Sequence, residues 1–474
     1  MDSDVSSQSH FAHLLQLQQQ TAILWRTSTA NERLARLKQL SDWILKNQRS
    51  IQTALWEDFK KPEAETDLSE VFPVTSEINH AKKHLKAWMK STKASMPMAM
   101  FGTSSHIQFE PKGCALIISP WNYPFNLTIG PLVSAIAAGC PAILKPSELT
   151  PNTSALIAKM VAELFKPEEV AVCLGGIEVS QELLALPFDH IFFTGSPKIG
   201  KIIMEKAAKH LASVTLELGG KSPTIVTSTA DIADAAKKIA FGKFVNSGQT
   251  CIAPDYILVH ESKKEHLIAE LILAVRDMYD PAHVGIEKSP DLARIIDNRH
   301  FNRISHCLQD ALEKGAKIEF GGRKNEKDLF IEPTILSGIA GEMVISEEEI
   351  FGPLMPIITY RSIQEAIDYI NQKPKPLALY IFGSTGETKE VLKKTSAGNA
   401  VIDDCVLHFL HNNLPFGGIG NSGIGKSHGY FGFLAFSHEK GVLKQRVGFN
   451  NATLLRPPYG LKTKKIIGSL IKWF

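Results

Sequence analysis

Cysteine is scarce in this sequence, and the few cysteines have none of the spacings that bind metals. The 474 residues contain no CxxC pair and no Cys/His cluster, and the six cysteines are Cys114, Cys140, Cys173, Cys251, Cys307 and Cys405. This scatter excludes a disulfide framework and a zinc site, and it is typical of a reducing compartment. We therefore expect no bound metal.

Long apolar runs and an excess of one charge are also absent. No stretch of 18 apolar residues occurs, which excludes a spanning helix, and the start, MDSDVSSQSHFAHLL, lacks the pattern of a secretory signal. The 52 basic and 49 acidic residues give a net charge of +3, so there is no electrostatic basis for binding nucleic acid. The composition predicts a cytoplasmic globular protein of two or three domains.

The first 90 residues or so have apolar residues at helical spacing, and from residue 113 strand-like and helix-like stretches alternate. Short apolar runs of strand length occupy 115–119, 142–145, 170–174, 190–194 and 213–217. A second series follows at 223–228, 256–260, 330–336, 354–360, 377–383 and 399–404, with helices expected at 262–279 and 289–317. Strands that alternate with helices predict two α/β domains with parallel sheets, joined by connecting arms.

Cys251 differs from the other cysteines because it follows a small polar run, NSGQT, and precedes an apolar one. Either its thiol reacts, or it is a small buried residue beside a turn. A thiol with an ordinary pKa of about 8.5 is only a few per cent thiolate at neutral pH, so a reactive one needs a base or a positive field. It also needs donors for the oxyanion that it creates. The other five cysteines are predicted to be buried and inert.

Four polar motifs follow predicted strands and could supply those groups. They are SPWNYP with Asn122, LKPSE with Lys145 and Glu148, FFTGSPKIG with Gly195 and Ser196, and LELGGKSP with Glu217. Open α/β sheets bind ligands at the carboxyl ends of their strands, and a helix N-terminus such as that after Ser196 suits a phosphate. Taken singly, each motif is more often a cap or a turn. Their coincidence in one chain favours a common site.

Seven motifs in this order resemble the signature set of the aldehyde dehydrogenase superfamily: PWNYP, LKPSE, FTGSPKIG, ELGGKSP, NSGQTCIAPDYIL, EEIFGP and LPFGGIGNSGIG. The similarity runs from about residue 20 to 445, and CIAPDYIL and HNNLPFGGIGNSGIG resemble the class 3 branch of fatty and aromatic aldehyde dehydrogenases. The resemblance implies a cofactor-binding domain at 1–217, with part of a bridging arm near 95–112. It also implies a catalytic domain at 218–412 and, at 413–474, a return to the cofactor domain, an oligomerisation segment and a tail.

The resemblance also implies a chemistry. Cys251 would add to the aldehyde, and the Asn122 side chain and the Cys251 backbone N–H would hold the oxyanion. Hydride transfer to a nicotinamide would leave a thioester, which water activated by Glu217 would hydrolyse to the free acid. The oxidation and the thioester hydrolysis would use the same oxyanion donors, which is consistent with covalent catalysis in two steps.

The cofactor residues implied by the resemblance lie in three motifs. Gly195, Ser196 and Gly200 match the pyrophosphate-binding turn; Lys145 and Glu148 match the contacts to the adenosine ribose; Glu349 and Phe351 match those to the nicotinamide ribose. NAD is the expected cofactor, and the branch often accepts NADP. A homodimer is expected.

The C-terminal segment, KTKKIIGSLIKWF at 462–474, has an amphipathic pattern. On a helix, Ile466, Ile467, Leu470, Ile471 and Phe474 share one face while the lysines point away. The segment is too short to span a bilayer, but a basic amphipathic end can lie on a membrane surface. Docking on this or a partner subunit is the alternative.

Three other functions remain open from the sequence. A cysteine acyl hydrolase would use the same thiol and Glu217 without a redox step, but it would have no use for the nucleotide motifs. An acylating dehydrogenase would pass the thioester to coenzyme A, which the presence of Glu217 disfavours by resemblance. A non-enzymatic binding protein is the third. The natural aldehyde cannot be read from the sequence.

Overall fold

A computed structural model describes residues 10–97, 100, 102–448 and 450–473. Its first sheet has six strands in the order β17-β7-β6-β3-β4-β5, of which all but the antiparallel edge strand β17 are parallel. In chain order the strands are β3 (Ala115–Ile118), β4 (Ala142–Lys145), β5 (Val170–Val172), β6 (His190–Gly195), β7 (Ser213–Leu218) and β17 (Gly423–Ile424). Their short, apolar and buried sequences are typical of strands covered on both faces.

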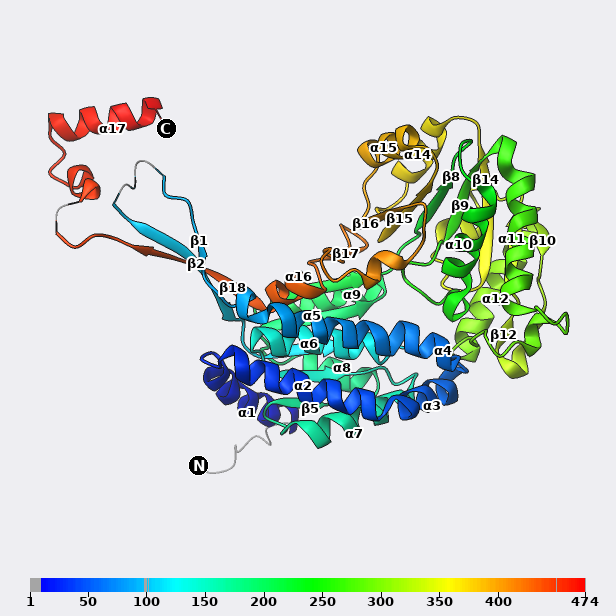
Figure 1. The fold of residues 1–474 in the computed structure, drawn as a ribbon, viewed down its shortest axis with the longest axis horizontal. Helices are drawn as coiled ribbons and strands as arrows, with labels where there is room; N and C mark the ends of the chain where they lie inside the picture. Colours follow the sequence, from blue (N-terminus) through cyan, green and yellow to red (C-terminus); the bar gives the residue numbers. More distant parts are fainter. Residues whose placement is uncertain (1–9, 98–99, 101, 449, 474) are drawn as a thin grey trace, which may run out of the picture.

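Helices cover both faces of this sheet (Figure 1). On one face pack α2 (Ala30–Lys46), α3 (Gln48–Phe59), α5 (Phe72–Trp88), α6 (Asn126–Ala138) and α7 (Pro151–Leu164). On the other face pack α1 (His10–Trp25), α8 (Ile177–Leu184) and α9 (Pro197–Ala208). The prediction that the first 90 residues are largely helical is confirmed, and these helices complete the core around the first sheet.

The second sheet has seven strands in the order β10-β13-β14-β9-β8-β15-β16, with only the edge strand β10 antiparallel. Its strands are β8 (Pro223–Val226), β9 (Tyr256–His260), β10 (Lys317–Phe320), β13 (Thr334–Ser337), β14 (Leu354–Tyr360), β15 (Ala378–Phe382) and β16 (Asn399–Ile402). The helices are α10 (Ile232–Phe244), α11 (Lys264–Tyr279), α12 (Asn298–Glu313), α14 (Ile363–Asn371) and α15 (Thr385–Lys394). The predicted α/β class with parallel sheets is confirmed.

A three-stranded antiparallel sheet forms an arm that projects from the body (Figure 1). It consists of β1 (Thr92–Lys93), β2 (Ser104–Pro111) and β18 (Ser437–Lys444), and it joins the body through α16 (Gly429–Ala435). At the far end of the arm lies the tail helix α17 (Leu461–Trp473), so the helical reading of the tail is confirmed up to residue 473. Phe474, which we expected on its apolar face, lies outside the described residues.

One predicted element is wrong in its extent. The helix expected at 289–317 covers only Asn298–Glu313, because Asp297 accepts a hydrogen bond from the N–H of His300 and so caps a new helix start. The residues before it form turns around Pro290, and Lys317 already belongs to strand β10. Among the described residues, no helix has the length and apolarity needed to cross a membrane.

Candidate active site

The loop that carries Cys251 has an unusual backbone. Asn246, Ser247 and Gly248 follow α10 and all have positive φ angles, of 55°, 52° and 73°. A Cβ at Gly248 would overlap the carbonyl oxygen of Gly352, so only glycine fits there. Consecutive left-handed residues are strained, and such strain persists where the surroundings fix the backbone.

Buried Gln249 supplies much of that fixation. Its side-chain Nε2 donates to the carbonyl oxygens of Asn246 and Arg294, both at 3.0 Å, and its Oε1 accepts from the Ile296 N–H, also at 3.0 Å. The bonds to Arg294 and Ile296 tie the loop to the chain that precedes α12, and the bond to Asn246 closes the loop on itself. Cys251 is therefore presented by a rigid loop.

Cys251 is half-buried, whereas the five other cysteines are buried and free, as predicted. Burial, and then the carboxyls of Glu349 and Glu217, raise the pKa of the Cys251 thiol to about 12, although the backbone N–H groups of Cys251 and Ile252 oppose this. The thiol is therefore neutral at physiological pH in this state. Its activation requires added positive charge or a base.

Asn122 lies on the loop between β3 and α6, and this loop interlocks with the cysteine loop. The Asn122 side-chain Nδ2 donates to the Gln249 carbonyl oxygen at 2.9 Å, and the Asn122 carbonyl oxygen accepts from Asn246 Nδ2 at 2.9 Å. Because a carbonyl oxygen can only accept, the amide nitrogen of Asn122 must face Gln249. Asn122 also lines the cleft beside Cys251.

Sequence reasoning missed a buried ion pair that supports Asn122. Lys61 and Glu70 are fully buried, with Lys61 Nζ 2.7 Å from Glu70 Oε1 and 3.4 Å from the Asn122 carbonyl oxygen. Glu70 Oε2 accepts from the Asn126 N–H at 2.8 Å, so the pair holds the loop at two points. Glu70 lies in a π-helical turn, Asp67–Val71, a distortion that is frequent at functional sites.

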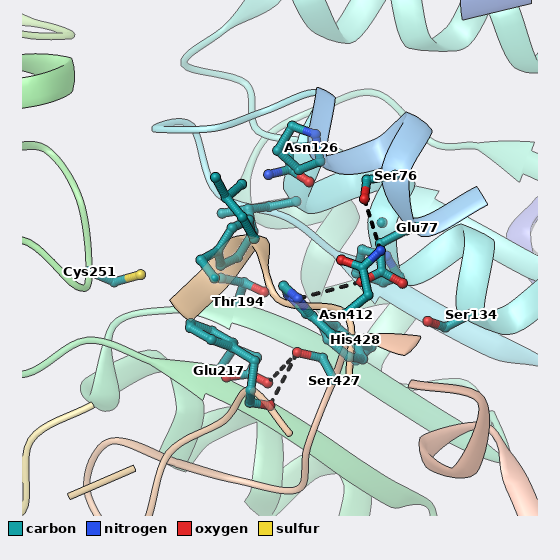
Figure 2. A pocket seen from close by; sticks show the side chains of 18 of the residues that line it. Ser76, Glu77, Asn126, Ser134, Thr194, Glu217, Cys251, Asn412, Ser427 and His428 are labelled. Atoms are coloured by element: carbon teal, nitrogen blue, oxygen red, sulfur yellow. Dashed lines mark hydrogen bonds and ion pairs between the residues drawn. The ribbon is translucent and has the colours of Figure 1, made fainter. Parts of the chain in front are cut away.

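Glu217 lies near the carboxyl end of β7, where the first sheet meets the cysteine loop. Ser427 Oγ donates to Glu217 Oε1 at 3.0 Å, while Glu217 Oε2 is buried without a hydrogen-bond partner among the described residues. Burial raises the pKa of Glu217 to about 8, and the Ser427 hydrogen bond and Lys426 partly oppose the shift. Figure 2 shows Cys251 and Glu217 lining one cavity, with Ser427 beside the carboxylate.

A larger cleft runs from this point along the carboxyl edge of the first sheet. It brings together Asn122, Gly195, Ser196, Glu217, Cys251, Glu349 and Phe351, with Lys198, Lys221, Arg303 and Lys373 also on its walls. Ser196 caps α9 by accepting from the Ile199 N–H, and a Cβ at Gly195 would clash with the Phe193 ring. Open backbone at a helix N-terminus, with basic side chains nearby, suits a pyrophosphate.

Gly200, Lys145 and Glu148 do not line this cleft. A Cβ at Gly200 would lie 2.7 Å from Leu218 Cδ2, so this glycine lets α9 pack closely on β7. Lys145 ends β4 and is buried, and its Nζ lies 2.7 Å from Oε2 of the half-exposed Glu148. Both residues lie at the same carboxyl edge of the sheet, one strand beyond β3.

Glu349 and Phe351 form the wall opposite the first sheet. The Glu349 carboxylate accepts from the Gly220 N–H, and burial, followed by the charge of Asp255, raises its pKa to about 8. Phe351 has a positive φ of 45°, and its ring lies edge-on to Trp121 with centroids 5.4 Å apart. Within the described part of the chain, no group of three or more His, Cys, Asp or Glu side chains is arranged to hold a metal.

A second, mainly apolar pocket opens on Cys251 from another side. The residues that line it are Leu68, Ser69, Pro73, Tyr123, Asn126, Leu127, Phe241, Val245, Thr250, Cys251, Ile252, Val406, Leu407, Phe409 and Leu410. None of these residues carries a charged side chain. The thiol therefore lies where an apolar pocket and a long polar cleft meet.

The profile of the aldehyde dehydrogenase family matches residues 5–442. The chain belongs to the aldehyde dehydrogenase family. It is 44% identical to 4,4'-diaponeurosporen-aldehyde dehydrogenase of Staphylococcus aureus, over 93% of this chain and 95% of the relative. It is 41% identical to aldehyde dehydrogenase family 3 member B1 of Bos taurus, over 96% of each chain. The protein is therefore an oxidoreductase, and the acyl hydrolase and the non-enzymatic alternative are set aside.

Solved structures agree with this assignment. The substrate-bound state of Staphylococcus aureus AldH superposes with a TM-score of 0.93 at 41% identity and covers 98% of this chain and 100% of that one. A betaine aldehyde dehydrogenase of the same species, solved in complex with NAD+, has a TM-score of 0.83 at 28% identity, over 92% of this chain and 88% of that one. The 474-residue chain, as a member of this family, therefore has a nicotinamide dinucleotide as its cofactor.

Proposed function

We propose that this aldehyde dehydrogenase oxidises an apolar aliphatic or aromatic aldehyde to the free carboxylic acid, through a thioester on Cys251 and with NAD as cofactor. The observation that carries the proposal is the position of the thiol at the junction of the apolar pocket and the polar cleft. An aldehyde that fills the pocket would present its carbonyl carbon to Cys251 and its hydrogen to the cleft.

The side chains around Cys251 can be given roles on this basis. The Cys251 thiol first loses its proton to water in the cleft, and the thiolate then attacks the carbonyl carbon. The oxyanion that forms is held by the Asn122 amide and the Cys251 backbone N–H. A bound nicotinamide dinucleotide supplies the acceptor for the hydride. Glu217 then takes a proton from the water that attacks the thioester, and the acid and the Cys251 thiolate are released. A single preorganised oxyanion donor contributes about 3 kcal/mol in comparable sites.

The polar cleft fits a dinucleotide in its charge and its backbone. Gly195 and Ser196 would hold the pyrophosphate, Glu349 and Phe351 the nicotinamide ribose, and Lys145 with Glu148 the adenosine ribose. The half-exposed Glu148 carboxylate would repel the 2′-phosphate of NADP, and its ion pair with Lys145 weakens the attraction that this lysine could offer. We therefore favour NAD over NADP.

The experiment that tests the proposed function is a kcat/KM series. Unbranched and aromatic aldehydes of increasing size, and a short aldehyde that carries a carboxylate, are compared with NAD and with NADP. We expect NADH formation with kcat/KM rising by about tenfold for each two methylenes added, until the pocket is filled, because each buried CH₂ contributes about 0.8 kcal/mol. Equal or better kcat/KM for the charged aldehyde would contradict the apolar substrate class.

The arm and the tail support two further parts of the proposal. Strands β1 and β18 of the arm are largely exposed and offer a surface for a second subunit. We propose a homodimer, whose mass sedimentation would measure. In α17, Ile466, Ile467 and Leu470 are half-buried while Leu461 and Ile471 are exposed beside several lysines, as in a helix that lies on a membrane surface.

Deleting residues 462–474 is expected to reduce partition onto anionic vesicles by about tenfold, because the deletion removes four lysines and the apolar face. Cosedimentation with vesicles that contain phosphatidylserine measures this. Neutral vesicles serve as the control, and activity on a soluble aldehyde reports that the body is intact. Unchanged partition would assign the tail to packing on this or a partner subunit.

A further inference from the structure

A cavity of about 50 Å³, enough for a few water molecules, lies beside Glu217, between the cysteine loop and the N-terminal helix α5 (Figure 2). One end is lined by Cys251, Thr194 and Glu217. The other end is lined by Ser76, Glu77, Asn412 and His428. The cavity therefore joins the proposed general base to a second buried carboxyl group that the mechanism above does not use.

The two carboxylates are held in the same way. Glu217 Oε1 accepts from Ser427 Oγ, and Glu77 Oε2 accepts from the Gly429 N–H at 2.9 Å. The other oxygen of each, Glu217 Oε2 and Glu77 Oε1, is buried and has no hydrogen-bond partner among the described residues. Buried polar atoms beside a cavity of this size are normally satisfied by water, so hydrogen-bonded water can connect the two carboxylates.

The surroundings of Glu77 make it a proton acceptor near neutral pH. Burial raises the pKa of Glu77 to about 7, and burial lowers the pKa of His428 to about 4, so the imidazole is neutral and makes no ion pair with it. His428 Nδ1 lies 3.5 Å from Glu77 Oε1. The other titratable groups near the cavity and these two residues are Glu217, Cys251, Lys426, His408 and His80.

We propose that Glu77, assisted by His428, accepts through cavity water the proton that Glu217 removes from the hydrolytic water. In thioester hydrolysis, the water oxygen bonds to the acyl carbon, the carbon–sulfur bond breaks with its electron pair leaving on sulfur as the Cys251 thiolate, and the water proton moves to Glu217. Glu217 must lose that proton before the next turnover, although it is buried behind the nucleophile. Transfer along the cavity to ionised Glu77, whose side chain is 11% exposed, returns the proton towards solvent. This inference rests on the proposed function.

A purely structural role for Glu77 makes a different prediction. Its hydrogen bond from Gly429 holds the start of α16, and a glutamine could accept the same bond. Glutamine cannot accept a proton from Glu217. The replacement Glu77→Gln therefore separates the two roles, and His428→Asn tests the assisting group at a position where the backbone has a positive φ of 72°.

The experiment follows NADH formation by wild-type enzyme, Glu77→Gln and His428→Asn in rapid-mixing and steady-state measurements, with and without added imidazole. We expect Glu77→Gln to keep the wild-type burst amplitude and to lose about tenfold in the steady-state rate. We expect a smaller loss in His428→Asn. Imidazole, which can accept a proton in the cavity and carry it out to solvent, should restore the Glu77→Gln rate at least threefold without affecting wild-type enzyme. The matched control is Glu332→Gln, a buried carboxyl group that pairs with Arg323 just before β13 and does not line the site; its activity should be unaffected.

The outcomes distinguish a failure of the proton relay from a failure of the proposed function. Steady-state rates within twofold of wild type in both variants would overturn the relay, as would a loss that imidazole does not restore. A burst amplitude that falls together with the steady-state rate would mean that fewer active sites are folded, and Glu77 would then have a structural role. Thermal unfolding of each variant would measure that loss of stability. No NADH formation by the wild-type enzyme with any aldehyde would instead contradict the proposed function.

Discussion

Cys251→Ala is expected to lower aldehyde oxidation by about 10⁴-fold or more while leaving nucleotide binding intact. The methyl side chain of alanine cannot add to the carbonyl carbon, so neither the hydride transfer nor the thioester can follow. The nucleotide cleft is formed largely by other side chains, and the strained loop is fixed by Gln249 rather than by the thiol. NADH formation and nucleotide titration by fluorescence measure the two effects.

Cys307→Ala is the matched control for this prediction. Cys307 is buried on α12, its pKa is raised to about 11 by burial, and it does not line the site. We expect full activity with a stability loss of about 1 kcal/mol, as for other small truncations in a core. Residual turnover in Cys251→Ala, or an acyl group found on another residue by mass spectrometry of trapped enzyme, would assign the nucleophile elsewhere.

Groups that lie at strand ends could be predicted from the sequence, and the structure shows why. The Asn122 loop follows β3, and Glu217 lies near the end of β7. These are parallel strands of one sheet with only β6 between them, so the topology alone brings both groups to the same edge. Their motifs are local: Glu217 is the last residue of its apolar run, and Asn122 comes three residues after its own. The cysteine loop reaches the same edge because the second sheet begins immediately after β7.

Groups that act across long sequence separations could not be predicted in this way. Lys61 supports Asn122 from 61 positions away, and Glu77 accepts from Gly429 across 352 positions. No local pattern marks either residue, because Glu77 lies on helix α5 and Lys61 lies in the short connection after α3, and a charged side chain in either place is usually solvent-exposed. Only the packing of the N-terminal helices against the first sheet buries them and gives them partners.

Glu217→Gln is expected to form one burst of NADH and then to turn over about 10³-fold more slowly than wild type. The amide keeps the size of the side chain and can accept the Ser427 hydrogen bond, so acylation of Cys251 should proceed. It cannot take a proton from water, so the thioester should accumulate. Rapid mixing measures the burst, and a normal steady-state rate after it would contradict the role of Glu217 as general base.

The pH dependence provides an independent check of the same role. A base acts only when deprotonated, and burial raises the pKa of Glu217 to about 8, so the hydrolysis rate of wild-type enzyme should rise as pH passes through about 8. The Ser427 hydrogen bond stabilises the carboxylate and lowers that pKa. Ser427→Ala should therefore move the rise to higher pH without removing it, whereas Glu217→Gln should remove it. A profile that keeps its midpoint in both variants would show that another group, such as Glu349 with its pKa of about 8, controls the step.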